Sequence, residues 1–416
     1  MKKKFVILSL MLALGVIGLS LQSCKKDDPV DLTLKTLVAG DIDLNGATSP
    51  NTVPTKPTIT ATFSTDVDPL TATTANIMLT QDYDGANITI TITTNKNVVT
   101  IVPEGDLSNG ALYKLDMKGG IKSTEGKFLT DLSRTFTTIG TFVPTGVIAH
   151  WPFEDNANDA VGSFDPAASG IVAITYTPSR NATAGKAATF NGTTSIIEIP
   201  NGDQLMNTNN FTISFWVKAV SAGIDHGHFV MGLGAFYGFQ YEIFGAYDGA
   251  KFAFRYGLEN GETTSEDMWF PALATDNTNG GWQGWDFAKS LTADEMIALL
   301  KDNWLHVTYT YDSQAKKGIL YYNGEKMKSF DFNLWPEGDA KTTVTGLKYG
   351  GVAPEVVNEL AFGFIHSRAG TLWDNEPWGG YDFPGANHFK GQLDDIRIFH
   401  KVLTPVEIQL MYDSEK

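Results

Sequence analysis

Apolar and polar residues alternate along much of the chain. In residues 59–63 and 88–93, apolar side chains alternate with threonine, and residues 211–218 and 304–311 alternate bulky with small side chains. A repeat of two places successive side chains on opposite faces of a β-strand. Residues 318–323 lead into Asn323-Gly324, a dipeptide typical of tight hairpins. The pattern therefore predicts an all-β protein.

Two short segments depart from this alternation and predict helices. In residues 291–296 and 403–408, a threonine is followed three residues later by a glutamate, and apolar residues flank both. This arrangement is typical of a capping box with a hydrophobic staple at a helix start. In the second segment, Pro405 takes the favoured first helical position.

The chain changes character near residue 145. All nine tryptophans and all seven histidines follow that point, whereas the earlier part is rich in threonine and poor in aromatic residues. We therefore expect two domains, residues 32–140 and 147–416, joined around residues 140–146.

The first of these domains resembles a bacterial Ig-like domain. The stretches that carry the resemblance are residues 59–69, 98–103, 107–115 and 134–138. The resemblance implies a β-sandwich of short strands. Such modules mostly act as spacers, and nothing in the stretch predicts chemistry.

The second domain resembles the laminin-G-like jelly roll of the concanavalin-type lectin superfamily. Five ordered motifs carry the resemblance, and they lie in residues 148–159, 188–218, 303–307, 322–325 and 389–412. The predicted architecture is thus an N-terminal Ig-like β-sandwich plus a C-terminal concanavalin-like jelly roll with short helices in insertions.

The N-terminal residues predict export and lipidation. Three lysines precede an apolar run over residues 5–19, which is short for a membrane span. Leu21-Gln22-Ser23-Cys24 resembles a bacterial lipobox, so we expect residues 1–23 to be a signal peptide, Cys24 to carry lipid and residues 24–31 to form a charged tether. Cys24 is the only cysteine, and lipidation would account for it. An ordinary secretory signal is the alternative.

The tether adds an expected address. Lys25-Lys26-Asp27-Asp28 resembles the charged export tag of surface lipoproteins in some Gram-negative bacteria. The resemblance implies the outer membrane, facing outside the cell, and outer-membrane uptake proteins become candidate partners. A solvated linker is the alternative.

The charge balance argues against nucleic acid as a partner. The formal net charge is -16, and Lys and Arg do not cluster outside the signal. Binding to a phosphate backbone needs such clusters.

No catalytic motif is recognisable. The Glu-x-Asp-x-x-Glu pattern of related glycosidases is absent, as is a Gly-x-Ser-x-Gly elbow. Asp394 and Asp395 are adjacent, so in a strand they would face opposite sides and could not form a facing pair. We therefore expect a protein that is not an enzyme, while a carbohydrate-active enzyme with an unrecognised site stays open.

Metal binding is predicted at one place. The loop 154–159 is rich in the oxygen ligands that Ca²⁺ prefers. The jelly-roll resemblance implies one structural calcium ion held by Asp159 and by Asp394 or Asp395. Turn-capping by these side chains is the alternative. His226-x-His228 could also bind a metal, but no third ligand is near in sequence.

Aromatic residues give the strongest ligand signal. Trp151, Trp216 and Trp304 lie in predicted framework strands and are expected in the core. Further tryptophans lie among polar and glycine-rich residues, where rings can stack on sugars and polar groups can bind hydroxyls. The predicted carbohydrate-binding residues are Trp269, Trp282, Trp285, Trp335, Trp373, Trp378, Tyr381, Asp286, Asp374 and Asn375. The alternative is that these rings anchor long loops.

These observations predict a surface lipoprotein that captures a glycan or polysaccharide without cleaving it. Contact with the membrane would be through the lipid anchor only. An adhesin or assembly component that binds another protein is the second hypothesis, and it would be favoured by a flat apolar patch.

Overall fold

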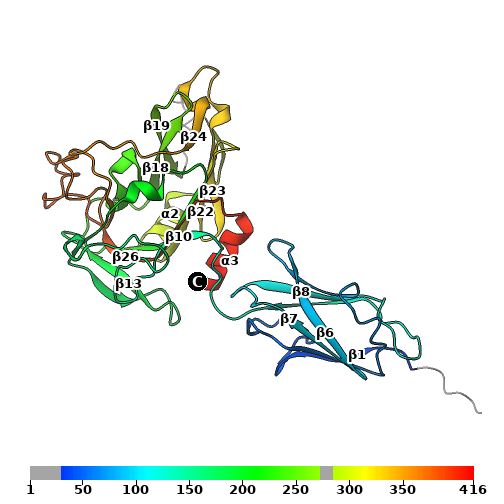
Figure 1. Cartoon of the computed structure of the whole chain (residues 1–416). Helices are drawn as coiled ribbons and strands as arrows, with labels where there is room; N and C mark the ends of the chain where they lie inside the picture. Colours follow the sequence, from blue (N-terminus) through cyan, green and yellow to red (C-terminus); the bar gives the residue numbers. More distant parts are fainter. Residues whose placement is uncertain (1–29, 272–283) are drawn as a thin grey trace, which may run out of the picture. The chain divides into compact units, whose positions relative to one another are not determined.

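The computed structural model describes residues 30–271 and 284–416 (Figure 1). The chain divides into two compact units, one ending at Ile139 and the other starting at Gly140. Within the described residues the fold is almost entirely β, with two α-helices, as the alternating sequence predicts. None of the helices in these ranges has the length and apolar character needed to cross a membrane.

The first unit is a sandwich of two antiparallel sheets. Its strands are β1 (Leu34–Ala39), β2 (Ile42–Asp43), β3 (Ile59–Phe63), β4 (Ile77–Gln81), β5 (Asn87–Ile88), β6 (Ile90–Asn95), β7 (Val98–Pro103), β8 (Leu112–Met117) and β9 (Leu132–Thr137). One sheet has the order β2-β1-β3-β7-β6 and the other β5-β4-β8-β9. In β3, Ile59, Ala61 and Phe63 are buried while the threonines between them are partly exposed, because alternate residues face the opposite sheet.

The second unit also consists of two antiparallel sheets packed face to face. Its strands are β10 (Val147–Trp151), β11 (Ile171–Val172), β12 (Thr175–Pro178), β13 (Lys186–Asn191), β14 (Ile196–Ile199), β15 (Phe211–Ala219), β16 (His228–Leu233), β17 (Phe239–Ile243), β18 (Ala250–Leu258), β19 (Thr263–Phe270), β20 (Trp285–Ala288), β21 (Leu305–Asp312), β22 (Lys317–Tyr322), β23 (Glu325–Asp331), β24 (Val344–Leu347), β25 (Leu360–Phe362) and β26 (Lys390–Phe399).

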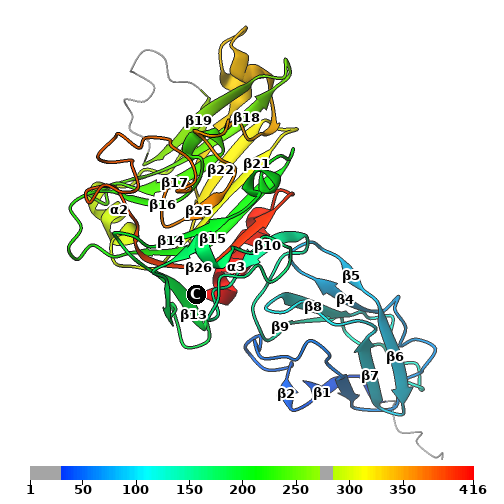
Figure 2. The ribbon, with the colours of Figure 1, turned by 60° about the vertical axis from the view of Figure 1, so that its left-hand side comes forward.

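The two sheets differ in strand order. The nine-stranded sheet runs β12-β13-β26-β15-β21-β22-β23-β20, with β10 also paired to β26. The eight-stranded sheet runs β11-β14-β25-β16-β17-β18-β19, with β24 paired to β18. Figure 2 shows the strands of both sheets lying one behind the other.

Both predicted helices form, and each begins at its predicted cap. They are α2 (Ala293–Leu300) and α3 (Pro405–Glu415), and short 3-10 turns occur at η1 (Ala168–Gly170), η2 (Gly202–Leu205), η3 (Ala235–Tyr237), η5 (Phe332–Leu334) and η6 (Ala340–Thr343). The Thr292 side chain accepts from the Glu295 amide, and the Glu295 carboxylate accepts from the Thr292 amide. Thr404 and Glu407 repeat this reciprocal cap.

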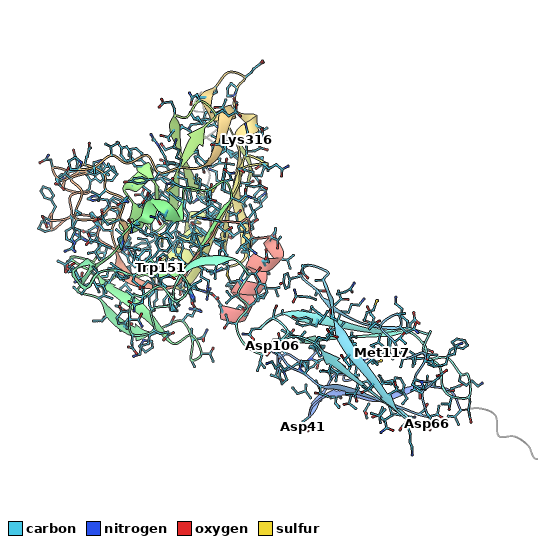
Figure 3. The ribbon with its side chains drawn as sticks, in the orientation of Figure 1. Asp41, Asp66, Asp106, Met117, Trp151 and Lys316 are labelled. Carbon is cyan, nitrogen blue, oxygen red and sulfur yellow. The ribbon has the colours of Figure 1, made fainter. Side chains whose placement is uncertain are left out.

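Aromatic rings fill the space between the sheets of the second unit. Trp151, labelled in Figure 3, is fully buried, and its ring meets Phe362 edge-on at 5.2 Å. Phe254 of one sheet stacks on Tyr309 of the other at 3.9 Å between ring centroids. Since a buried hydroxyl needs a hydrogen-bond partner, the Tyr309 hydroxyl pairs with that of Tyr256 at 2.6 Å.

A buried ion network lies on the outer side of the nine-stranded sheet, beneath α3. Arg397 of β26 donates to Glu415 of α3 at 2.6 Å and to Asp395 at 2.8 Å. Arg180 donates to Asp394 and, at 2.7 Å, to Asp395. Burial and the neighbouring Asp395 carboxylate raise the pKa of Asp394 to about 8.

The other framework tryptophans lie outside the space between the sheets. Trp216 is buried under α3, where its indole donates to the Glu415 carboxylate at 2.6 Å and lies 4.7 Å from the Arg180 guanidinium. Trp304, which precedes β21, is only half-buried.

We expect the buried His306 side chain in this region to make the folded protein less stable in acid. Burial, reinforced by the charges of Arg397 and Arg180, lowers the pKa of His306 to about 3. The unfolded chain takes up a proton at this residue near pH 6.5, whereas the folded chain does not. The free energy of unfolding therefore falls as pH drops below 6.5, by at most about 1.4 kcal/mol per pH unit from this group.

We expect His306→Gln to remove that contribution. Denaturant unfolding at pH 7 and pH 5 should show the wild type losing roughly 2 kcal/mol more than the variant. Equal losses in the two proteins would contradict a neutral, buried His306.

Candidate functional site

One exposed region of the second unit combines rings with polar groups, and it lies on the outer face of the eight-stranded sheet. Phe239, Tyr241 and Ile243 of β17 point into the core, so Gln240 and Glu242 point outward. The same alternation continues in β18 and β19. The outer face over β17 to β19 is therefore polar by sequence.

A row of four residues crosses this outer face. Phe229 of β16 pairs with Glu242, Glu242 pairs with Lys251 of β18, and Lys251 pairs with Trp269 of β19. We call these four residues the outer row; Figure 2 shows the strands that carry it side by side. With neighbouring strands about 4.8 Å apart, the row spans roughly 14 Å.

Trp269 is the last residue of the row and lies at the sheet edge. Its side chain is 47% exposed. The ring packs beside Phe244 at 5.0 Å, and the Lys251 ammonium lies 5.2 Å from its centroid. These contacts fix the indole while nearly half of the residue's surface stays exposed.

Trp378 lies beyond the other end of the row, next to Phe229. It is 43% exposed and comes from the loop between β25 and β26, which covers part of the outer face. Its ring lies 6.3 Å from Phe229 and 4.8 Å from Trp373. Trp373 in turn contacts Phe236 and is half-buried, so it supports Trp378 from behind.

A pocket of about 180 Å³ lies between these two ends. Its lining residues are Gly227, His228, Phe229, Glu242, Ile243, Phe244, Gly245 and Asn387. Phe244 touches Trp269, and the backbone amide of Asn387 donates to the backbone carbonyl of Trp378 at 3.1 Å. We define the outer-sheet site as the outer row, this pocket and Trp378.

The charged groups of the site are held by one lysine. Lys251 lies 3.0 Å from the Glu242 carboxylate and 3.6 Å from that of Asp267. Burial raises the pKa of Glu242, and Lys251 offsets this only in part. Beside Glu242, Gln240 is 3% exposed, and its side-chain oxygen has no hydrogen-bond partner among the described residues.

Three of the predicted sugar-binding rings thus lie at the outer-sheet site or support it, namely Trp269, Trp373 and Trp378. Asp374 and Asn375 are exposed in the same loop as Trp378. The remaining predicted residues are placed differently.

Tyr381 serves the packing of that loop. Its hydroxyl donates to the Thr194 carbonyl at 2.6 Å, and its ring meets Phe364 edge-on at 5.4 Å. Its contacts favour a supporting role.

Trp285 and Trp335 pack against the main core and are half-buried. Lys328 lies 5.7 Å from the Trp285 ring and Lys341 lies 4.4 Å from the Trp335 ring. These contacts favour the alternative that both rings anchor loops.

Asp286 is engaged by neighbouring strands, and Trp282 lies outside the described residues. Asp286 accepts from Lys317 at 2.8 Å and from Ser329. Burial alone would raise its pKa, but these hydrogen bonds together lower it. For both residues a role in sugar binding stays a prediction.

Sequence reasoning missed Phe229, Glu242, Phe244, Lys251 and Asn387. The signal for Glu242 and Lys251 was present, because both stand at polar positions of otherwise apolar alternating strands. The strand register that aligns them with Phe229 and Trp269 cannot be read from one chain.

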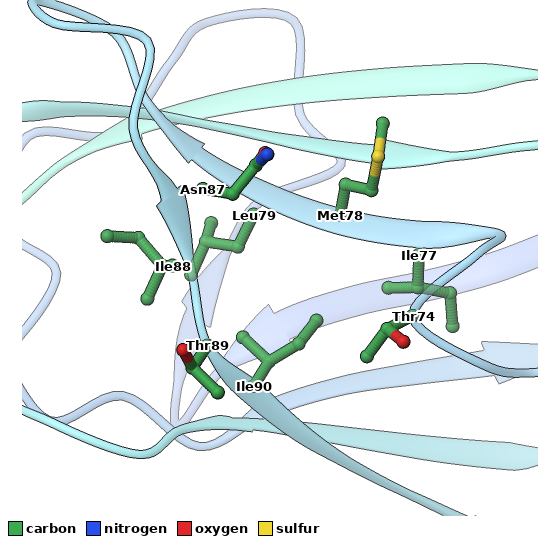
Figure 4. A pocket seen from close by; sticks show the side chains of 8 residues that line it. All are labelled: Thr74, Ile77, Met78, Leu79, Asn87, Ile88, Thr89 and Ile90. Atoms are coloured by element: carbon green, nitrogen blue, oxygen red, sulfur yellow. The ribbon is translucent and has the colours of Figure 1, made fainter.

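The first unit offers a contrasting pocket. About 310 Å³ lies between β4 and the segment containing β5 and β6, and Figure 4 shows its lining. The lining residues are Thr74, Ile77, Met78, Leu79, Asn87, Ile88, Thr89 and Ile90. They include no ring and no charged group, so a sugar would find neither stacking nor strong hydrogen bonds there.

The predicted calcium ligands have other partners. Asp159 accepts from the amides of His150, Val161 and Phe164, as a turn cap does. Arg180 donates to both Asp394 and Asp395. A guanidinium thus supplies positive charge at these two carboxylates.

No grouping of three or more His, Cys, Asp or Glu side chains suited to a metal occurs in residues 30–271 and 284–416. His228 is buried, and its ring bonds to the Tyr247 hydroxyl at 2.7 Å. Burial lowers the pKa of His228 to about 4.

Calcium itself stays a prediction that chelation can test. Because Arg180 already pairs with Asp394 and Asp395, we expect EDTA to leave the melting temperature of the second unit unchanged. A melting temperature that drops by several degrees with EDTA and recovers with added calcium would contradict this.

The comparisons with known proteins assign both domains. Residues 44–138 match the bacterial Ig-like domain family, and residues 191–355 match the concanavalin A-like lectin/glucanases superfamily. The second unit therefore has the fold of a lectin-like jelly roll. More particularly, a match to bacterial Ig-like domains is followed along the chain by a match to laminin-G-like domains. No curated protein matches the chain.

Solved structures similar to this chain include toxin binding domains. The binding domain of Paraclostridial Mosquitocidal Protein 1 is 15% identical, with a TM-score of 0.40. The botulinum neurotoxin serotype D ligand binding domain in complex with N-acetylneuraminic acid is 14% identical, with a TM-score of 0.38. The matches cover 65% and 64% of this chain, and this chain spans about half the length of each, 52% and 50%.

Proposed function

We propose that this protein binds carbohydrate at the outer-sheet site and does not cleave it. The observation that carries the proposal is the pairing of two half-exposed tryptophans with a pocket between them that includes polar side chains. Trp269 and Trp378 stand at opposite ends of the outer row, and Glu242 and Asn387 line the pocket. The concanavalin A-like lectin fold supports the proposal.

The chemistry of this arrangement suits a sugar. The C–H face of a pyranose ring packs against an indole, and its hydroxyls bind carboxylate and amide groups. Glu242 can accept from two hydroxyls, and the Asn387 amide can donate as well as accept.

The charges at the site favour binding over hydrolysis. A glycosidase needs two carboxylates that face each other across the scissile bond. Here Glu242 and Asp267 both turn to the Lys251 ammonium, which lies between them. Glu242, Asp267 and Lys251 thus form a cross-strand ion triad.

A polysaccharide panel tests the proposal. The chain starting after Cys24 is run in native gels containing β-1,3-glucan, hydroxyethyl cellulose, mannan, xylan or pectin, and hits are measured by calorimetry. We expect retarded migration in at least one polysaccharide and no release of reducing ends. Release of reducing ends would favour the enzyme alternative, and no binding to any polysaccharide would contradict the proposal.

We further propose that Cys24 anchors the protein to the outer membrane, facing outward, where outer-membrane uptake proteins are candidate partners. The motif around Cys24 supports this, although residues 1–29 lie outside the described residues. In a Gram-negative host, Cys24→Ser should move the protein from the membrane fraction to the soluble fraction. External protease should digest the wild-type protein on intact cells. A membrane-bound Cys24→Ser variant, or protection from protease, would contradict the placement.

A further inference from the structure

The cations around the outer-sheet site are already paired. Lys251 binds both Glu242 and Asp267. On the same strand, Arg255 donates to the Thr263 hydroxyl at 2.9 Å, and its guanidinium lies over the Tyr237 ring at 5.7 Å. Lys251 is therefore neutralised by two carboxylates, whereas the partners of Arg255 are uncharged.

The loop at the Trp378 end is acidic. Residues 371–383 contain Asp374, Glu376 and Asp382 and no lysine or arginine. All three acidic residues are exposed, and within the described parts of the chain none of them forms an ion pair. The loop that carries Trp378 therefore has an excess of negative charge, and the nearest counter-charge is Arg368, which pairs with Glu198 and also interacts with Asp382.

We infer that the outer-sheet site selects uncharged glycans and rejects chains of uronic acids. The inference rests on the proposed function and adds the class of ligand. Stacking on Trp269 and Trp378 does not depend on charge, so both kinds of chain gain that contact. Only the acidic chain must bring carboxylates close to Asp374, Glu376 and Asp382, and like charges in a partly desolvated site repel.

The physical origin of this selection gives it a salt dependence. The three loop carboxylates are exposed, so their repulsion acts through water and is screened by ions. The preference for the uncharged chain should be large in 20 mM NaCl and smaller in 500 mM NaCl. Selection by shape alone would not change with salt.

The test compares chains that differ only in charge. β-1,3-glucan, hydroxyethyl cellulose and mannan are each used untreated and after oxidation of their primary hydroxyls to carboxylates. Calorimetry with the full mature chain should show at least tenfold weaker binding of the oxidised form in 20 mM NaCl. In 500 mM NaCl, the ratio of the two dissociation constants, oxidised over untreated, should be severalfold smaller.

A charge variant and a matched control locate the effect. In the triple variant D374N/E376Q/D382N, the dissociation constants for the oxidised and the untreated chain should lie within about threefold of each other. The control D82N/E104Q/E125Q removes three exposed carboxylates from the first unit and should leave the ratio as in the wild type. This control separates the local field from the net charge of the whole protein.

The outcomes distinguish the two proposals. Equal or tighter binding of an oxidised chain in 20 mM NaCl would overturn the charge selection and leave carbohydrate binding intact. An equal effect of the control variant would also overturn it. Absence of binding to every chain, untreated or oxidised, would overturn the proposed function and this inference with it.

Discussion

Replacing Arg397 with methionine is expected to lower the free energy of unfolding of the second unit by about 3–5 kcal/mol. Arg397 is 3% exposed and donates to Glu415 and Asp395. Methionine fills much of the same space but cannot donate a hydrogen bond. The substitution leaves two buried carboxylates without their main partner, and it loosens α3 from β26.

The measurement is urea unfolding followed by tryptophan fluorescence. All nine tryptophans lie after residue 145, so the signal reports on the second unit alone. Lys289→Met is the matched control, because it removes an exposed ion pair with Glu325 in the same unit and should have a small effect. A loss below 1 kcal/mol for Arg397→Met would show that the network contributes little.

Replacing Trp269 or Trp378 with alanine is expected to weaken glycan binding at least tenfold each. Truncating an aromatic residue that contributes strongly to binding costs about 2 kcal/mol or more, which exceeds a factor of ten in affinity. Both rings are nearly half-exposed, so their removal leaves no enclosed cavity, and the fold should persist. Together the two substitutions should abolish detectable binding.

Phe287→Ala is the control for this pair of variants. Phe287 is 40% exposed on β20, which belongs to the other sheet, and it is not part of the outer-sheet site. Its loss should leave the affinity within about twofold of the wild type. Binding that survives in the Trp269 and Trp378 variants but disappears in Phe287→Ala would place the ligand on the other sheet.

The sequence predicted the local features of the fold well. Alternation in residues 59–63 and 211–218 and the caps at Thr292 and Thr404 depend on neighbours within a few positions, and the structure confirms them. Domain type was also predictable, because ordered motifs in each half resemble known families.

The candidate site was predicted only in part, since it depends on distant pairings. Strand register places Trp269 in the outer row, and a later loop brings Trp378 against Phe229 at the other end of that row. The surroundings of Asp394 and Asp395 show the same limit. Arg180 lies more than 200 residues before the two aspartates that it binds, so no residue near Asp394 in the sequence indicated this pairing.

Hydrogen–deuterium exchange on the full mature chain, with and without the polysaccharide it binds best, tests the location of the site most directly. We predict that bound polysaccharide slows amide exchange in residues 227–229, 239–270 and 376–388, which carry the outer-sheet site. Slower exchange confined to residues 284–335 or to the Ig-like domain would contradict the account.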